Sequence, residues 1–323
     1  MFIIIIIIII YQMRSLTTTG AAVLLASAAA LVSANYDSNI ATRAMYYSGA
    51  SYCAKSTLDP WACGEPCTVN SGLQQIVKIE NELLDTFGYV GYNSRDNEVV
   101  LAFRGTNGAD FLNWMTNIVY YRVQYADVPN TQVHSGFYTA YNAVSNSIIN
   151  SLAALLKQYP SASLMITGHS LGGALATFAA LDIKRRINPS NKINFYSFGS
   201  PRTGNQAFTD YIMSLFPAGG YQRVTHYTDM VVQVPPRQLG FNHAGNEAWY
   251  YNTNDLNVKV CENNAGSLES TSCADSYIFT TGIDAHLNYL GHPISGMCLQ
   301  KGVRDPAIQA QMDFNKLNEQ TSQ

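Results

Sequence analysis

Charged residues are scarce in this chain of 323 residues, since Lys, Arg, Asp and Glu together make up 13% of it. It has no long run of Lys or Arg, and its formal net charge is −3, which excludes the basic surface expected of a nucleic-acid-binding protein. No Asn-X-Ser/Thr sequon occurs, so N-glycosylation is not expected. The chain also lacks an internal repeat and a linker between two halves, and its 47% hydrophobic content suffices for one large core.

An apolar run long enough to span a membrane is missing too. The run from Ala21 to Val32 is about 12 residues, whereas a spanning helix needs about 20. Met13-Arg14 before it and Val32-Ser33-Ala34 after it make the run typical of a secretory signal peptide. Eight isoleucines precede this pattern as a low-complexity stretch, and Met13 is a better initiator than Met1. We expect residues 1–34 to be removed, and the mature protein to be extracellular or in the lumen of a digestive compartment.

Six cysteines follow the signal peptide: Cys53, Cys63, Cys67, Cys261, Cys273 and Cys298. An even number in a secreted chain predicts three disulfides, and spacing alone leaves 15 possible connectivities. Cys63 and Cys67 have no second cysteine pair or histidine pair at zinc-binding spacing. The sequence therefore predicts neither a metal nor another cofactor.

Apolar strand patterns alternate with helical patterns through most of the chain. Strands are expected at 88–92, 99–104, 164–168, 193–198 and 222–227, and helices at 135–159, 172–186 and 206–216. Alternating strands and helices predict a mostly parallel sheet covered on both faces. The order matches an α/β-hydrolase core formed by residues 35–300 as a single domain, followed by a polar tail at 301–323.

Gly168-His169-Ser170-Leu171-Gly172 is the G-x-S-x-G pattern of a nucleophile elbow. An apolar strand pattern leads into it, and a helix of small residues leads out, which is the context that the motif requires. Such a turn exposes the serine hydroxyl and points helix N-terminal N–H groups toward a developing oxyanion. The alternative is a glycine-rich turn that carries an ordinary surface serine.

A serine nucleophile needs a histidine base and a carboxylate that orients it, in the chain order Ser, Asp or Glu, His. Asp229 directly follows a predicted strand, where sites of open α/β sheets gather. Four histidines lie downstream of Ser170, and their order favours the last two, His286 and His292, over His226 and His243. The residues alone leave this choice open.

Five segments together resemble the fungal-type class 3 lipases (Rhizomucor/Thermomyces-like), a family that includes a feruloyl esterase branch. The similarity runs from about Tyr36 to Cys298. The segments are Phe103–Thr106, Val133–Phe137, Gly168–Gly173, Arg223–Asp229 with Pro235-Pro236, and Asp284–Gly291.

The resemblance implies a catalytic triad of Ser170, Asp229 and His286. It also implies an oxyanion hole formed by the backbone N–H groups of Thr106 and Leu171, to which the Thr106 hydroxyl adds a third donor. The implied disulfides are Cys53–Cys298, Cys63–Cys67 and Cys261–Cys273. His226, His243 and His292 take no catalytic role in this pattern.

The segment after Thr106 is an apolar stripe with helical spacing, formed by Phe111, Leu112, Met115, Ile118 and Val119, with Trp114 beside it. In the lipases this segment is a lid that covers the site in water and binds substrate at a lipid surface. The alternative is an amphipathic helix that stays packed on the core.

Three functions are compatible with these residues. The first is a secreted, monomeric lipase that acts on acylglycerols at a lipid–water interface, which the apolar lid segment favours. The second is a soluble esterase of the feruloyl esterase type, because Arg223–Asp229 and Gly240–Trp249 look closer to that branch. The third is an inactive lipid-binding protein, which the intact triad pattern disfavours.

Overall fold

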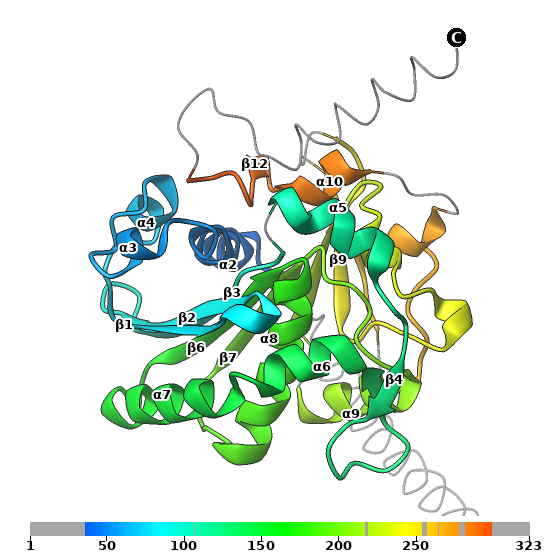
Figure 1. Cartoon of the computed structure of the whole chain (residues 1–323), viewed down its shortest axis with the longest axis horizontal. Helices are drawn as coiled ribbons and strands as arrows, with labels where there is room; N and C mark the ends of the chain where they lie inside the picture. The colour runs from blue at the N-terminus through cyan, green and yellow to red at the C-terminus, as the bar shows by residue number, and fades with distance from the viewer. Residues whose placement is uncertain are drawn as a thin grey trace, which may run out of the picture. The chain divides into compact units, whose positions relative to one another are not determined.

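A mostly parallel sheet of eight strands forms the centre of the fold (Figure 1). The computed structural model describes residues 36–106, 108–216, 219–253, 257–263, 265–277 and 282–298. The expected signal segment at 1–34 and the expected tail at 301–323 lie outside these residues. The strands are β1 (Leu73–Asn81), β2 (Thr86–Asn93), β3 (Glu98–Phe103), β6 (Ser163–His169), β7 (Ile193–Phe198), β8 (Tyr221–His226), β9 (Asn246–Tyr250) and β10 (Val258–Cys261).

The strands follow the order β1-β2-β3-β6-β7-β8-β9-β10 across the sheet. The five from β3 to β9 are parallel, and β1, β2 and β10 are added antiparallel at the two edges. Parallel strands end at one edge of the sheet, so the loops that follow β3, β6 and β8 come together there. The expected α/β-hydrolase architecture is therefore confirmed.

Helices cover both faces of the sheet (Figure 1). Successive residues of a strand point to opposite faces, so each strand contacts helices on both sides. Val99, Leu101 and Phe103 of β3 pack with α7 (Ser145–Gln158) and α8 (Leu171–Arg186), whereas Val100 and Ala102 pack with α2 (Ser38–Ala50). The other helices are α3 (Lys55–Leu58), α4 (Glu65–Val69), α5 (Gly108–Asn117), α6 (Ser135–Asn142), α9 (Gln206–Leu215) and α10 (Ile283–Leu287).

Short elements complete the connections between these layers. Two small antiparallel sheets pair β4 (Arg122–Gln124) with β5 (Gln132–His134) and β11 (Asn288–Tyr289) with β12 (His292–Pro293). The 3-10 turns are η1 (Glu82–Leu84), η2 (Val231–Gln233), η3 (Arg237–Leu239) and η4 (Ala274–Ser276).

The prediction of one helix over 135–159 is wrong, because α6 ends at Asn142 and α7 begins at Ser145. At the break, the Ser145 hydroxyl donates to the carbonyl oxygen of Asn142, which satisfies an acceptor that the interruption leaves free. Val144 is buried at this point among the side chains that cover the sheet. Residues of both helices pack in the same core.

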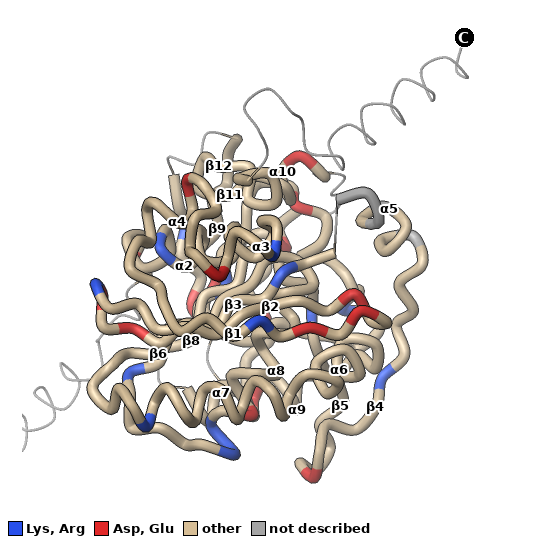
Figure 2. Tube along the Cα trace, turned by 60° about the vertical axis from the view of Figure 1, so that its left-hand side comes forward, with Lys and Arg blue, Asp and Glu red and all other residues tan. Residues whose placement is uncertain are grey.

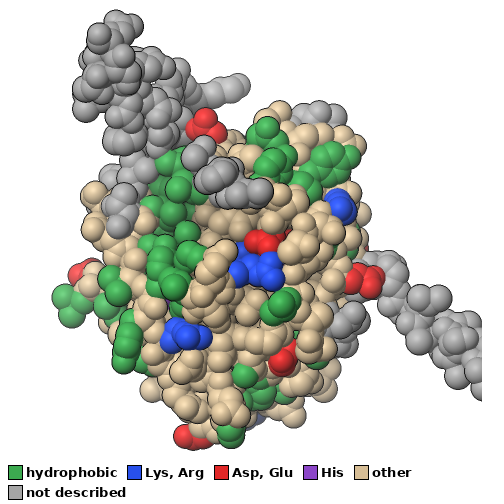
Figure 3. Space-filling view, turned by 90° about the vertical axis from the view of Figure 1, so that its right-hand side faces the viewer, with side chains coloured by type: hydrophobic (Ala, Val, Ile, Leu, Met, Phe, Trp, Pro, Cys, Tyr) green, Lys and Arg blue, Asp and Glu red, His purple; other side chains and the backbone are tan. Residues whose placement is uncertain are grey.

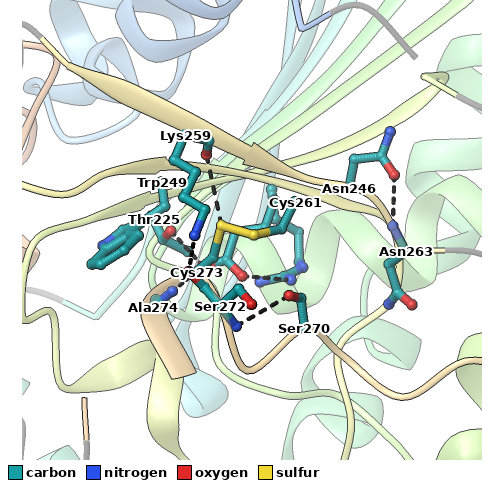
Figure 4. Close-up of a disulfide and its surroundings, with 12 residues drawn as sticks. Thr225, Asn246, Trp249, Lys259, Cys261, Asn263, Ser270, Ser272, Cys273 and Ala274 are labelled. Carbon is teal, nitrogen blue, oxygen red and sulfur yellow. Dashed lines mark hydrogen bonds and ion pairs between the residues drawn. A yellow bond between two sulfur atoms is a disulfide. The ribbon is translucent and has the colours of Figure 1, made fainter. Parts of the chain in front are cut away.

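Three disulfides join the described cysteines in the pairing that the family resemblance implies. Cys53–Cys298 joins the segment after α2 to the last described residue, and Cys63–Cys67 closes a turn of α4. Cys261–Cys273 ties the end of β10 to the turn before η4. Figure 4 shows it beside Trp249 and Thr225, which lie on the neighbouring strands.

Charged residues are scattered along the described chain in small groups of mixed sign (Figure 2). Among the described residues, no helix has the length and apolar character to cross a membrane.

Candidate active site

Ser170 occupies the sharp turn between β6 and α8, with φ 57° and ψ −130°. A non-glycine residue in this region is strained, and such strain persists only where the surroundings fix it. The Ser170 N–H donates to the Phe198 carbonyl oxygen at 2.9 Å, and a Cβ atom at Gly168 would lie 2.2 Å from the Gly172 carbonyl oxygen. Glycine at 168 thus lets strand and helix meet at the angle that an elbow needs.

Asp229 and His286 form a buried pair at the same edge of the sheet. Asp229 follows β8, and His286 lies in α10, 57 residues later. His286 Nδ1 lies 3.0 and 2.9 Å from the two carboxylate oxygens of Asp229. The carboxylate also accepts from the Val231 N–H at 2.8 Å and from the Tyr289 hydroxyl. With a proton on Nδ1, the Nε2 atom of His286 is the one that can accept another proton.

The two atoms that acid–base chemistry would use are buried and have no hydrogen-bond partner among the described residues. They are Ser170 Oγ and His286 Nε2. Buried polar atoms nearly always have partners, so these two atoms, in one site with Asp229, are candidates for contact with a substrate. Catalytic hydrogen bonds are often long before substrate binds. Ser170, His286 and Asp229 therefore come from three segments to the same edge of the sheet, where His286 and Asp229 are paired.

The loop after β3 lies directly against Ser170. β3 pairs with β6 up to Phe103 opposite Gly168, and a Cβ atom at Gly105 would lie 2.9 Å from the Ser170 Cβ atom. Thr106 follows, and its hydroxyl oxygen is buried without a partner among the described residues. Leu171 is the first residue of α8, so its N–H has no partner within the helix. Both expected oxyanion residues thus lie beside the serine.

His169 connects this loop to the base through a chain of hydrogen bonds. The Gly105 N–H donates to the Tyr52 hydroxyl oxygen at 3.0 Å, and that hydroxyl donates to His169 Nδ1 at 2.7 Å. His169 Nε2–H then donates to the His286 carbonyl oxygen at 2.8 Å. Burial, and secondarily the nearby His286 ring, hold the pKa of His169 well below its usual value. A neutral His169 with its proton on Nε2 can therefore hold both neighbours in place.

Comparison with known proteins assigns the family. Residues 100–239 match the family described as lipase (class 3). A lipase of Rhizomucor miehei is 34% identical over 257 residues, which are 78% of this chain and 68% of that lipase. The chain belongs to the class 3 lipase family. Secreted mono- and diacylglycerol lipase A of Penicillium camembertii is 32% identical over 183 residues, which are 57% of this chain and 58% of that protein.

A solved structure of another lipase is similar to this fold. It is that of a triacylglycerol lipase whose catalytic centre is formed by a serine protease triad. It covers 80% of this chain and 96% of its own, with 33% sequence identity and a TM-score of 0.72.

In this member of the class 3 lipase family, helix α5 covers the base. The Phe111 ring is 2% exposed and stacks on the His286 ring with 4.9 Å between centroids. Phe111 packs in a small apolar cluster with Val231, Ile283 and Leu287, which Trp114 and Met115 join from the same helix. The Leu112 side chain lies outside the described residues.

The expected helical stripe is wrong at its end. α5 ends at Asn117, so Ile118 and Val119 lie beyond the helix. Ile118 packs against the core, and Val119 is 72% exposed.

His226, His243 and His292 have hydrogen-bond partners other than Ser170 and Asp229. His226 bonds with the carbonyl oxygens of Ala285 and Asn252 through its two nitrogens, and His243 bonds with the Val232 carbonyl oxygen. His292 lies 3.2 Å from the Tyr46 hydroxyl instead of near Ser170. Of the two histidines that chain order left open, His286 is the one that meets Asp229.

Sequence reasoning gave no role to Tyr52 or Tyr289. Tyr289 was inside a segment used for the resemblance, but nothing in the pattern pointed its hydroxyl at Asp229. Tyr52 precedes the site by more than 50 residues, and no motif marks it. Within the described ranges, no cluster of three or more His, Cys, Asp or Glu side chains could hold a metal ion.

Proposed function

We propose that the protein is a secreted serine ester hydrolase that acts as a lipase on acylglycerols. The observation that carries the proposal is the His286–Asp229 pair, which leaves His286 Nε2 without a partner among the described residues, in the same buried site as the Ser170 hydroxyl. The family supports it, because the relatives are named as lipases and a mono- and diacylglycerol lipase.

The residues suit a two-step acyl transfer. Ser170 Oγ attacks the ester carbonyl carbon while His286 Nε2 takes the hydroxyl proton, and Asp229 stabilises the resulting imidazolium. The backbone N–H groups of Leu171 and Thr106 would bind the oxyanion, with each such donor contributing about 3 kcal/mol to the transition state. His286 then gives its proton to the leaving alcohol. Water, activated by the same histidine, releases the fatty acid from the acyl-enzyme.

The apolar side of helix α5 faces the site, which favours a lipid rather than a soluble ester as the substrate. Phe111, Trp114 and Met115 place apolar groups against the site, and Phe111 touches the base itself. We infer that α5 is a lid whose apolar side faces the site in water and faces lipid when open. The enzyme would act outside the cell as a monomer, and the N-terminal signal pattern supports its secretion, as does the Penicillium relative, which is named as a secreted lipase.

The nucleophile is tested with a serine-directed phosphonate on the intact protein. Label is expected at Ser170 alone, and Ser170→Ala is expected to lower ester hydrolysis by at least about 10³-fold while the protein stays folded. Ser48→Ala is the matched control, because Ser48 Oγ is also buried without a partner among the described residues but lies on α2. Labelling of another serine would overturn the triad assignment.

A feruloyl-type esterase is the second candidate, because parts of the chain after Arg223 look closer to that branch. Rates on emulsified long-chain triglyceride, a soluble short-chain ester and a feruloyl ester separate the two. A lipase is expected to prefer the emulsion. A preference for the feruloyl ester, with no response to emulsification, would favour the second candidate.

A further inference from the structure

A polar cavity of about 640 Å³ lies outside the Ser170 site. Its volume is typical of sites that hold a small molecule. The chain contributes to it from the loop after β7, from η2 and η3 with the residues beside them, and from the segment around η4. The lining residues are Arg202, Gln233, Pro236, Arg237, Gln238, Asn242, Leu268, Asp275 and Tyr277.

The Arg202 side chain forms a wall of this cavity that is held from several sides. Its Nε–H donates to the Glu269 carboxylate at 3.0 Å, and its other nitrogens donate to Asp275 at 3.0 Å and to the Gln233 side-chain oxygen at 3.1 Å. It also donates to the backbone carbonyl oxygens of Gln233 and Pro235 at 2.6 and 3.2 Å. Arg202 is 1% exposed. The wall is therefore fixed before a ligand binds, which reduces the entropy that binding costs.

The charged groups at the cavity balance one another. Arg202 pairs with Glu269 and with Asp275, and Asp275 also pairs with Arg237. Two guanidinium groups and two carboxylates thus cancel, which leaves little net attraction for an anion or a cation. Figure 3 shows a face on which basic and acidic side chains lie together among uncharged ones. An uncharged ligand with many hydrogen-bonding groups suits such a cavity.

Asn242 gives the cavity a polar group that a ligand can use. The residue is 7% exposed, and its backbone N–H donates to the Gly204 carbonyl oxygen at 2.8 Å. The next N–H, of His243, donates to Glu269 at 2.8 Å, so the backbone at this point is fixed. The Asn242 side-chain amide has no hydrogen-bond partner among the described residues, although it lines the cavity. A buried amide nearly always has partners, and this one offers both donors and an acceptor.

We propose that this cavity binds an uncharged saccharide. Sugar hydroxyl groups both donate and accept hydrogen bonds, so they match the amides of Asn242 and Gln238. Pro236 and Tyr277 give the C–H surface of a sugar ring an apolar contact. The inference goes beyond the proposed function and does not rest on it. A saccharide here would attach the protein to a glycan while the Ser170 site stays free.

The test titrates the full chain with three neutral trisaccharides, cellotriose, maltotriose and xylotriose, in a calorimeter. At least one is expected to bind with a Kd below about 10 mM. Asn242→Leu keeps the size of the side chain but removes its hydrogen bonds, and is expected to weaken binding by about tenfold. Gln238→Ala changes an exposed residue and is expected to weaken it by about threefold or more. Asn39→Leu is the matched control, since Asn39 is exposed on α2, and should bind within about twofold of the parent protein.

Three results would overturn the saccharide site. The first is that none of the three trisaccharides binds. The second is binding that Asn242→Leu and Gln238→Ala both leave unchanged, because the sugar would then lie elsewhere. The third is binding of trigalacturonate alone that is lost in salt, which would make the cavity an anion site. Trisaccharide binding by a protein that hydrolyses no ester would support the cavity and reject the proposed function, so the two can fail separately.

Discussion

Replacing Phe111 with serine tests whether α5 opens. The Phe111 ring is 2% exposed and lies on the His286 ring, so opening must transfer it from an apolar cluster to water. Burial of a phenylalanine side chain stabilises a closed state by about 2 kcal/mol, which is roughly a thirtyfold change in the ratio of open to closed forms. Phe111→Ser should shift the lid toward the open form by about that factor.

The assay compares a short-chain ester below and above its solubility limit. The parent enzyme is expected to be slow below the limit and to accelerate steeply when droplets form. Phe111→Ser is expected to raise the rate on dissolved ester, by up to about thirtyfold, and to shrink the acceleration. Asn113→Ser, on the exposed side of the same helix, should behave like the parent enzyme. If Phe111→Ser instead lowers both rates in proportion to its loss of stability, α5 is a fixed helix and the lid argument is wrong.

Two further predictions concern stability. Replacing both Cys53 and Cys298 with serine should lower the free energy of unfolding by about 5 kcal/mol, because their disulfide closes a loop with a sequence separation of 245; a chemical denaturation curve unchanged from the parent protein would contradict this. Burial lowers the pKa of His134 to about 4 from an unfolded value of 6.5, so the unfolded state binds the proton first as pH falls. Its stabilising contribution, complete above pH 6.5, should be lost between pH 6.5 and 4 and amount to about 3 kcal/mol. The His134 side chain accepts from the Phe137 N–H at the start of α6, and His134→Asn keeps an oxygen acceptor there. The free energy of unfolding should therefore fall less for this variant than for the parent protein between pH 7 and pH 4. An equal fall would show that His134 does not cause the loss of stability.

Local patterns in the sequence were sufficient for the elbow and the sheet. The strand before Ser170, the small helix after it and the glycines between them act over a few residues, so their conformation follows from neighbouring residue types. The alternation of strands and helices likewise predicted the parallel sheet. The helix break at Asn142–Ser145 was missed, because it serves the packing of Val144 in a core that the local pattern does not reveal.

Only the tertiary structure decided between the two late histidines on physical grounds. His286 and His292 are six residues apart and both satisfy the required chain order, but α10 brings His286 Nδ1 to Asp229, while β12 carries His292 toward Tyr46. The hydrogen bonds of Tyr52 and Tyr289 also depend on the tertiary structure, since each joins residues that are 53 or more positions apart. Residue type and spacing fix which groups are available for the chemistry. Which of them meet depends on where the sheet returns distant segments to one edge, because hydrogen bonds form only between atoms about 3 Å apart, whatever their separation along the chain.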